Sequence, residues 1–166
     1  MESRPGGIIR VDARRIGLIS DTHGLLRPEV FTAFRDVELI LHAGDVGPDE
    51  ILDELGAIAP VYAVRGNTDP FHNPRLPDAR ELEIKGLAIH VSHGHEVGAT
   101  PAQLLATYKA DVIVYGHSHR ELVTRANGRL VVNPGAAGAR RFDLEPCVAL
   151  MTIETAEVEI ELIRLS

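Results

Sequence analysis

The chain has 166 residues, of which 45% are hydrophobic and 25% charged, and it carries a net charge of −7. This is the composition of an ordinary globular domain, and a chain of this length typically builds one core. We therefore expect a single domain over residues 1–166, with the Pro-, Gly- and charge-rich residues 1–14 loosely ordered. The acidic balance, with no tryptophan and no basic cluster, argues against a surface that coats nucleic acid.

The sole cysteine, Cys147, lies among apolar residues, so no intramolecular disulfide can form. No apolar run approaches the length of a membrane span, and residues 1–15 lack the apolar stretch of a secretory signal. We expect a cytoplasmic protein that does not cross a membrane.

The first half of the chain alternates apolar runs with proline-led helical segments. Runs at 15–20, 37–42 and 61–65 have the length of buried strands, and each is followed closely by a polar residue. The segments between them, 28–34 and 48–55, open with proline and place apolar residues at helical spacing. Strand, helix, strand, helix, strand predicts parallel pairing with right-handed crossovers.

The second half continues this order and then changes. Strands are predicted at 88–92 and 111–115, with a helix at 101–108 between them. After residue 119 come apolar runs at 122–124, 130–132, 147–153 and 158–165, and the Asn127-Gly128 pair between the first two predicts a hairpin. We therefore predict an α/β fold, a four-layer α/β/β/α sandwich of two packed mixed sheets with flanking helices.

Five predicted strands end in residues that can bind metal ions. In chain order these are Asp21-x-His23, Gly44-Asp45, Gly66-Asn67, His93 and Gly116-His117-Ser118-His119. Ligands collect at the carboxyl ends of strands in α/β sheets, and a pair of divalent ions needs oxygen and nitrogen ligands with one bridging carboxylate. Each element alone is weak, but five in this order predict a two-metal centre, with Asp45 as the bridge.

Glycine precedes Asp45, Asn67 and His117, and another glycine, Gly24, follows His23. A glycine lets the backbone turn sharply or approach an ion where a Cβ would obstruct it. The turn at Gly24 would allow Asp21 and His23 to converge on the first ion.

These motifs resemble the pattern DxH, GDxx, GNH(E/D), H, GHxH of the calcineurin-like metallophosphoesterase family, over nearly the whole chain. The length is similar to that of its small bacterial and archaeal phosphodiesterase branch. The resemblance implies one ion held by Asp21, His23, Asp45 and His119, and a second held by Asp45, Asn67, His93 and His117. It also implies manganese as the usual metal, with iron, zinc, nickel or cobalt as alternatives.

The sequence departs from the family pattern at Thr68, where the family has a histidine credited with stabilising the transition state or protonating the leaving group. Threonine is no general acid near neutral pH, so that role is vacant, has moved to a group such as His95, or is unnecessary for a good leaving group. Asp69 matches the family's acidic position, and we expect it to orient a neighbouring ligand rather than to bind metal. The small branch commonly lacks this histidine, which favours diesters over monoesters.

The hypothesis that follows is hydrolysis of a phosphodiester by in-line attack of a metal-bridging hydroxide. Asn67 would bind metal and touch a phosphate oxygen, and His95 would act as acid or phosphate contact. Near the predicted loops lie Arg65, Arg120, Arg140 and Arg141, each a candidate phosphate contact or a solvated surface charge. We assign no site role to His42, His72 and His90. Residues 132–135 (VNPG) resemble a loop of the small branch and form either part of the substrate mouth or a simple turn.

Other functions stay open at this stage. A phosphomonoesterase or a nuclease is the alternative among enzymes, although the acidic surface disfavours a processive nuclease. A non-catalytic scaffold, like the small retromer subunit on this fold, and a metal or nucleotide sensor are the alternatives outside catalysis. The sequence does not encode the natural phosphoester substrate in a readable form. It also leaves the oligomeric state open between a monomer and a homo-oligomer, although the family that it resembles often forms dimers or tetramers.

Overall fold

The computed structural model describes residues 7–141 and 143–165. The helices are α1 (Pro28–Ala33), α2 (Glu50–Gly56) and α3 (Pro101–Thr107). The strands are β1 (Ile8–Val11), β2 (Arg15–Ile19), β3 (Leu39–His42), β4 (Val61–Ala63), β5 (Ala79–Ile84), β6 (Leu87–Ser92), β7 (Val112–Val114), β8 (Leu122–Ala126), β9 (Arg129–Asn133), β10 (Cys147–Glu154) and β11 (Glu157–Arg164).

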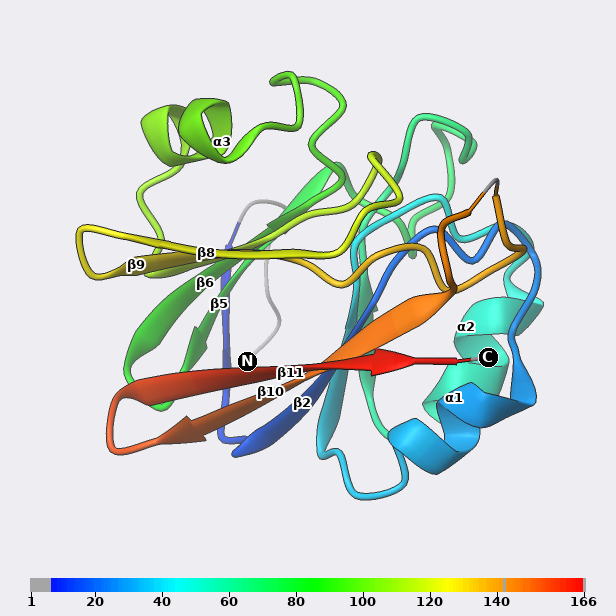
Figure 1. Cartoon of the computed structure of the whole chain (residues 1–166), viewed down its shortest axis with the longest axis horizontal. Helices are drawn as coiled ribbons and strands as arrows, with labels where there is room; N and C mark the ends of the chain where they lie inside the picture. The colour runs from blue at the N-terminus through cyan, green and yellow to red at the C-terminus, as the bar shows by residue number, and fades with distance from the viewer. Residues whose placement is uncertain (1–6, 142, 166) are drawn as a thin grey trace.

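The strands form two mixed sheets that face each other (Figure 1). Sheet A has the order β1-β5-β6-β7-β9-β8, and sheet B has the order β11-β10-β2-β3-β4. Pairing is parallel through β2, β3 and β4 in sheet B and through β6, β7 and β9 in sheet A. The predicted hairpin at Asn127-Gly128 joins β8 to β9, and β10 pairs antiparallel with both β2 and β11.

The main core lies between the two sheets and follows from the alternation of side chains along each strand. On β2, Ile16 and Leu18 face this core, while Ile19 faces the helices on the other side. On β7, Val112 and Val114 face the same core from sheet A. Because both faces of these strands are covered, they read as continuous apolar runs in the sequence.

The helices cover the outer faces. Val30 and Phe34 of the α1 region, and Leu55 of α2, pack against sheet B, and Leu104 of α3 packs against sheet A. The phenyl ring of Phe34 approaches the backbone of β2 so closely that a Cβ at Gly17 would lie 2.9 Å from it. This arrangement confirms the predicted four-layer α/β/β/α sandwich.

Two strands were not predicted. Residues 8–11 form β1, so the expectation of loose order over residues 1–14 is wrong there, and residues 1–6 lie outside the described part of the chain. β1 pairs parallel with β5, which was also missed. No helix in the described part of the chain is long and apolar enough to span a membrane.

Candidate metal centre

The seven predicted ligand residues lie at one edge of the sandwich, where strands of both sheets end. Loops after β2, β3 and β4 of sheet B, and after β6 and β7 of sheet A, bring them there. Sheet B supplies Asp21, His23, Asp45 and Asn67, and sheet A supplies His93, His117 and His119. The edge is therefore built from two halves that meet across the core.

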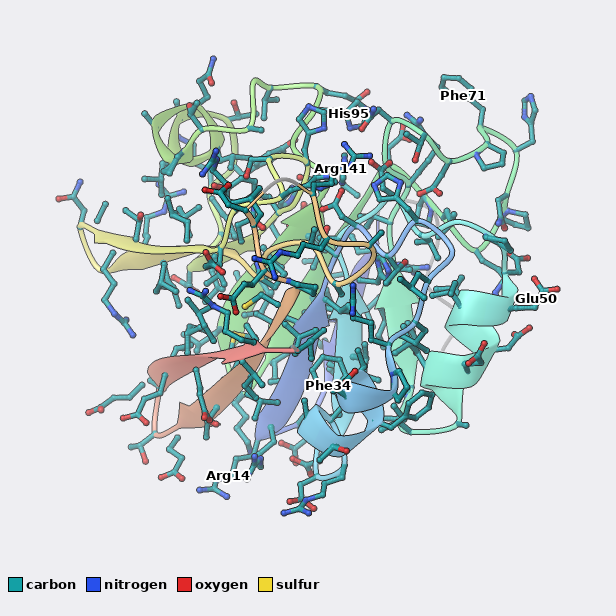
Figure 2. The ribbon with its side chains drawn as sticks, turned by 45° about the vertical axis from the view of Figure 1, so that its right-hand side comes forward. Arg14, Phe34, Glu50, Phe71, His95 and Arg141 are labelled. Carbon is teal, nitrogen blue, oxygen red and sulfur yellow. The ribbon has the colours of Figure 1, made fainter. Side chains whose placement is uncertain are left out.

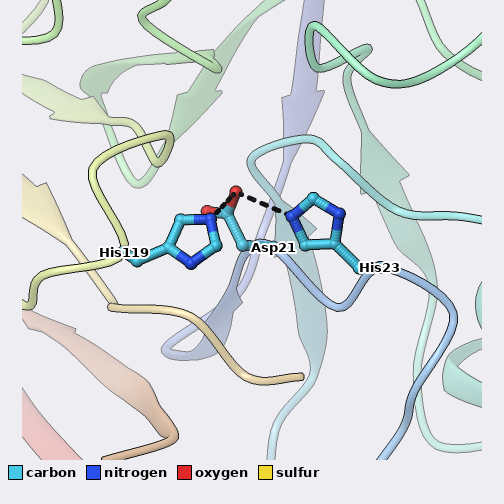
Figure 3. A group of neighbouring side chains, drawn as sticks. All are labelled: Asp21, His23 and His119. Carbon is cyan, nitrogen blue, oxygen red and sulfur yellow. Dashed lines mark ion pairs between the residues drawn. The ribbon is translucent and has the colours of Figure 1, made fainter. Parts of the chain in front are cut away.

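One group of potential ligands consists of Asp21, His23 and His119 (Figure 3). Oδ1 of Asp21 lies 3.6 Å from Nε2 of His23 and 3.4 Å from Nε2 of His119. The imidazoles of His23 and His119 therefore converge on one carboxylate oxygen from opposite sheets.

A second group consists of Asp21, Asp45 and His93. Oδ2 of Asp45 lies 3.2 Å from Nε2 of His93 and 3.5 Å from Nε2 of His23. Oδ1 of Asp21 is 3.8 Å from Nε2 of His93. Asp45 thus lies between imidazoles of both groups, as a bridging residue would, and Asp21 is common to the two groups.

Asn67 and His117 lie against each other at the exposed rim, with 3.1 Å between Oδ1 of Asn67 and Nδ1 of His117. The ring centroid of His117 is 5.1 Å from that of His93, and its backbone N–H donates to Oδ2 of Asp21 over 3.2 Å. Both residues border the second group without belonging to either three-residue group.

Three buried polar atoms of the predicted ligand residues have no hydrogen-bond partner among the described residues, namely Oδ1 of Asp21, Nε2 of His93 and Nδ1 of His119. Buried polar atoms in folded proteins almost always have a hydrogen-bond partner. Buried atoms without a partner therefore indicate a bound ion or water. Ligand atoms around one ion with bonds of roughly 2.1 Å lie about 3.0 to 3.4 Å apart, close to the separations found here. The mixed oxygen and imidazole set therefore fits a divalent transition metal.

Five of the seven side chains are carried on strained backbone. Left-handed φ angles between 46° and 72° occur at Asp21, His23, Asp45, His117 and His119. Residues other than glycine rarely adopt this conformation, and such strain concentrates at functional sites where the surrounding structure enforces it.

The glycines that precede the ligands are required by close packing, as predicted. A Cβ at Gly66 would overlap the carboxylate of Asp45, and one at Gly116 would overlap the hydroxyl of Ser20. A Cβ at Gly44 would lie 2.7 Å from Nδ1 of His93. The loops from different strands can approach one another only because these side chains are absent.

The electrostatics of the centre favour ionised carboxylates. Burial alone would raise the pKa of Asp21, but the neighbouring imidazoles of His119 and His23, 3.4 and 3.6 Å away, outweigh it and bring this pKa below its usual range. Burial of Asp45 is likewise outweighed, by His93 and Thr68, and its pKa is about 2. These carboxylates in turn raise the pKa of His23 and, against the effect of burial, that of His93. A dication would displace the protons held by these imidazoles.

Thr68 and Asp69 make hydrogen bonds that support the centre. The backbone N–H and the hydroxyl of Thr68 both donate to Oδ1 of Asp45, over 2.9 and 2.7 Å. The buried carboxylate of Asp69 accepts hydrogen bonds from the N–H groups of Val46, Gly47 and Gly66, and so ties the loop after β3 to the loop after β4. Oδ2 of Asp45 is left free to face the imidazoles.

Other supporting residues were missed in the sequence because their partners are distant along the chain. Ser20 donates to Oδ2 of Asp21 over 2.7 Å. His42 is buried, with Nε2 3.0 Å from the hydroxyl of Thr22 and Nδ1 accepting from the N–H of Gly44. Asn133 donates to the carbonyl oxygen of Gly116. The Asn-Pro-Gly segment therefore fixes the turn that carries His117.

The other candidate contacts, His95, Arg141 and Arg65, differ in how exposed they are. The ring of His95 lies 5.4 Å from that of His93 and 6.2 Å from that of His117, and burial and the neighbouring His93 lower its pKa. Arg141 is exposed, and its charge opposes protonation of His23. Arg65 is buried and hydrogen-bonded to Asp78, so it is not a solvated surface charge.

Comparison with known proteins agrees with this geometry. A probable metallophosphoesterase of Methanothermobacter thermautotrophicus is 38% identical over 158 residues, which cover 90% of this chain and 91% of that protein. A phosphodiesterase of Methanocaldococcus jannaschii is 30% identical over 139 residues, covering 73% of this chain and 82% of the relative. The crystal structure of Vps29 from Chaetomium thermophilum has the same fold, with a TM-score of 0.77 at 21% identity, covering 93% of this chain and 100% of Vps29.

The family model for the calcineurin-like phosphoesterase superfamily domain matches residues 15–156. This range contains every residue of the two ligand groups. The chain therefore belongs to the calcineurin-like phosphoesterase superfamily.

Proposed function

We propose that the protein is a metal-dependent phosphodiesterase with two divalent ions in the centre, manganese being the expected metal. The observation that carries this proposal is that two of the buried atoms without a hydrogen-bond partner, Oδ1 of Asp21 and Nε2 of His93, face carboxylate and imidazole neighbours within 3.2–3.8 Å. The similarity to a phosphodiesterase of M. jannaschii supports the choice of reaction.

Two ions, when bound, would lower the pKa of a water molecule to provide the nucleophile and would offset the charge that develops on phosphate oxygens. Asp21, His23, Asp45 and His119 would hold one ion, and Asp45, Asn67, His93 and His117 would hold the other. The 3.1 Å between Oδ1 of Asn67 and Nδ1 of His117 matches the spacing of two ligand atoms on one ion, and Nδ1 would have to be free of its proton to bind.

The chain's own residues would orient the reaction. Thr68 fixes the carboxylate of Asp45 through two hydrogen bonds, and Asp69 holds the backbone on which both Asp45 and Asn67 stand. Because Thr68 has its hydroxyl committed to Asp45, it offers no proton to a leaving group. His95 is the imidazole beside the second group that could donate a hydrogen bond to the leaving oxygen.

The vacant acid position favours phosphodiesters with good leaving groups over monoesters. The test is to strip the metals, return Mn²⁺ and assay p-nitrophenyl phosphodiester and monoester hydrolysis. We expect turnover of the diester that requires metal, exceeds that of the monoester and is lost in Asp45→Asn. Tight binding of two metal ions without turnover of either ester would instead indicate a scaffold or sensor.

The role of His95 needs its own control, and His72, an exposed histidine on the loop between β4 and β5, provides it. We expect His95→Ala to lower kcat, and His72→Ala to leave it unchanged. Wild-type turnover in His95→Ala would remove His95 from the mechanism while leaving the metal centre intact.

A further inference from the structure

An exposed phenyl ring lies on the loop that carries the predicted ligand Asn67. Phe71 is 77% exposed, whereas the other exposed large apolar side chains of the described residues are between 36% and 54% exposed. It lies in the loop between β4 and β5, four positions after Asn67. A single exposed apolar residue is common on protein surfaces, so its environment must decide whether it has a use.

That environment is a buried guanidinium. The Cζ atom of Arg65 lies 4.3 Å from the centroid of the Phe71 ring, and Arg65 itself is only 5% exposed. Nε of Arg65 donates to Oδ1 of Asp78 over 2.8 Å, and Nη1 donates to the carbonyl oxygen of Gly66 over 3.2 Å. A cation this deeply buried is held in one orientation by its partners. The inner face of the ring therefore rests on a rigid support.

The support is tied to the metal centre itself. Gly66 directly precedes Asn67, and its backbone N–H is held by Asp69, so the Arg65 side chain is attached to the loop that carries a predicted ligand. In the view of Figure 2, Phe71 and His95 both lie along the upper side of the molecule.

The outer face of the ring is free, and its properties suit stacking. A cation on one face of an aromatic ring draws electron density toward itself, which reduces the repulsion between the other face and a second π system. Leaving a phenyl ring in water contributes nothing to folding, so an aromatic ligand that covers it would gain the burial of both surfaces.

We propose that Phe71, supported by Arg65, is a stacking platform that selects substrates whose ester group carries a flat aromatic ring, such as a nucleobase or an aryl group. The proposal rests on the phosphodiesterase function proposed above and specifies its substrate class. The phosphoryl group would lie at the metal centre while the ring of the ester group stacks on Phe71.

The test compares two ligands that differ only in the ring. Phenylphosphonate and methylphosphonate are titrated calorimetrically into the Mn²⁺-loaded full-length protein, and the preference is the ratio of their Kd values. Phe71→Leu keeps an apolar side chain over Arg65 but removes the flat ring, and Phe71→Trp keeps an aromatic face. Phe31→Leu is the matched control, because Phe31 is an exposed phenyl on α1, a helix on the outer face of sheet B.

We expect Phe71→Leu to reduce the preference for phenylphosphonate about five- to tenfold, in line with the strength of aromatic pairs, with the affinity for methylphosphonate unchanged. Phe71→Trp and Phe31→Leu should keep the preference. An unchanged preference in Phe71→Leu, an equal loss for both ligands, or no binding of phenylphosphonate to the wild type would overturn the proposal.

Assaying p-nitrophenyl phosphodiester turnover in the same preparations separates this proposal from the proposed function. A wild-type protein that prefers phenylphosphonate through Phe71 but hydrolyses no diester would contradict the phosphodiesterase and support the platform. A protein that hydrolyses the diester equally well with Phe71→Leu, and shows no change in ligand preference, would contradict the platform alone.

Discussion

The two sheets contribute different chemistry to the metal centre. Sheet B brings both carboxylates, the amide of Asn67 and one imidazole, while sheet A brings three imidazoles. The carboxylates Asp21 and Asp45 are buried and supported by hydrogen bonds from neighbouring loops, whereas His117 and His119 are more exposed and lie on a turn with left-handed backbone. Negative charge is thus concentrated in one half of the centre, and the other half would supply imidazole ligands.

The largest expected effect comes from replacing the carboxylate that contacts imidazoles from both sheets. Asp21→Asn should reduce metal-dependent kcat/KM by about 10³-fold, because Oδ1 of Asp21 faces His23, His93 and His119 together. Steady-state kinetics with Mn²⁺ check this. Asp36→Asn, at an exposed carboxylate paired with Arg35, is the control and should retain wild-type activity. Equal activity in both variants would break the assignment of Asp21.

Metal binding should stabilise the packing of the two sheets, since its ligands come from both. At a metal concentration one hundred times Kd, binding adds about 2.7 kcal/mol to the unfolding free energy. For a chain of this size that corresponds to a rise in Tm of about 5 to 10 °C. Thermal unfolding with and without Mn²⁺ measures the rise, and His93→Gln should reduce it. A stripped protein as stable as the loaded one would mean that metal does not join the sheets.

The close approach of the loops after β3 and β4 can be disrupted by a substitution that leaves every predicted ligand in place. Gly66→Ala places a methyl group into the carboxylate and backbone nitrogen of Asp45, and should destabilise the protein by about 2 kcal/mol while lowering metal affinity. Gly56→Ala is the matched substitution, because a Cβ there meets nothing within 4 Å. Denaturant unfolding and metal titration of both variants test the difference. A mild effect of Gly66→Ala, like that of Gly56→Ala, would contradict the required close packing.

A smaller effect is expected from buried His42, which should make the stability of the protein depend on pH. Burial lowers the pKa of His42 to about 4, so the unfolded chain binds its proton first as pH falls below 6.5. The neutral buried His42 therefore costs stability on acidification, about 1.4 kcal/mol between pH 7.5 and 5.5. In the metal-free protein, His42→Gln should lose this part of the pH dependence. Its metal content at pH 7.5 should equal that of the wild type, since His42 is not a predicted ligand.

Much of this architecture could be predicted from the sequence because the residues with metal-binding side chains come soon after the apolar runs. The buried strands β2, β3, β6 and β7 read as continuous apolar segments, and the predicted ligands lie in the residues that follow them. Strands β1 and β5 were missed because they lie toward the edge of sheet A, where half-exposed side chains interrupt the apolar pattern. The alternation of Leu82 and Ile84 in β5 was the signal that could have found that strand.

The support of the centre could not be predicted, because it depends on contacts between loops that are distant along the chain. Thr68 was recognised as a departure from the family pattern, but its two hydrogen bonds to Asp45 span 23 positions. Arg65 was expected either to contact phosphate or to be solvated. It is instead buried beneath Phe71, a position that only the folded loop between β4 and β5 defines.

The central claim is that the two halves together hold two ions, and the most direct test counts them. The metal-stripped protein is incubated with Mn²⁺, desalted and analysed for bound metal per chain, together with His23→Gln from sheet B and His93→Gln from sheet A. We expect two equivalents in the wild type and about one in each variant, because each substitution removes a ligand of a different ion. One equivalent or none in the wild type, or full occupancy in both variants, would contradict a two-metal centre shared between the sheets.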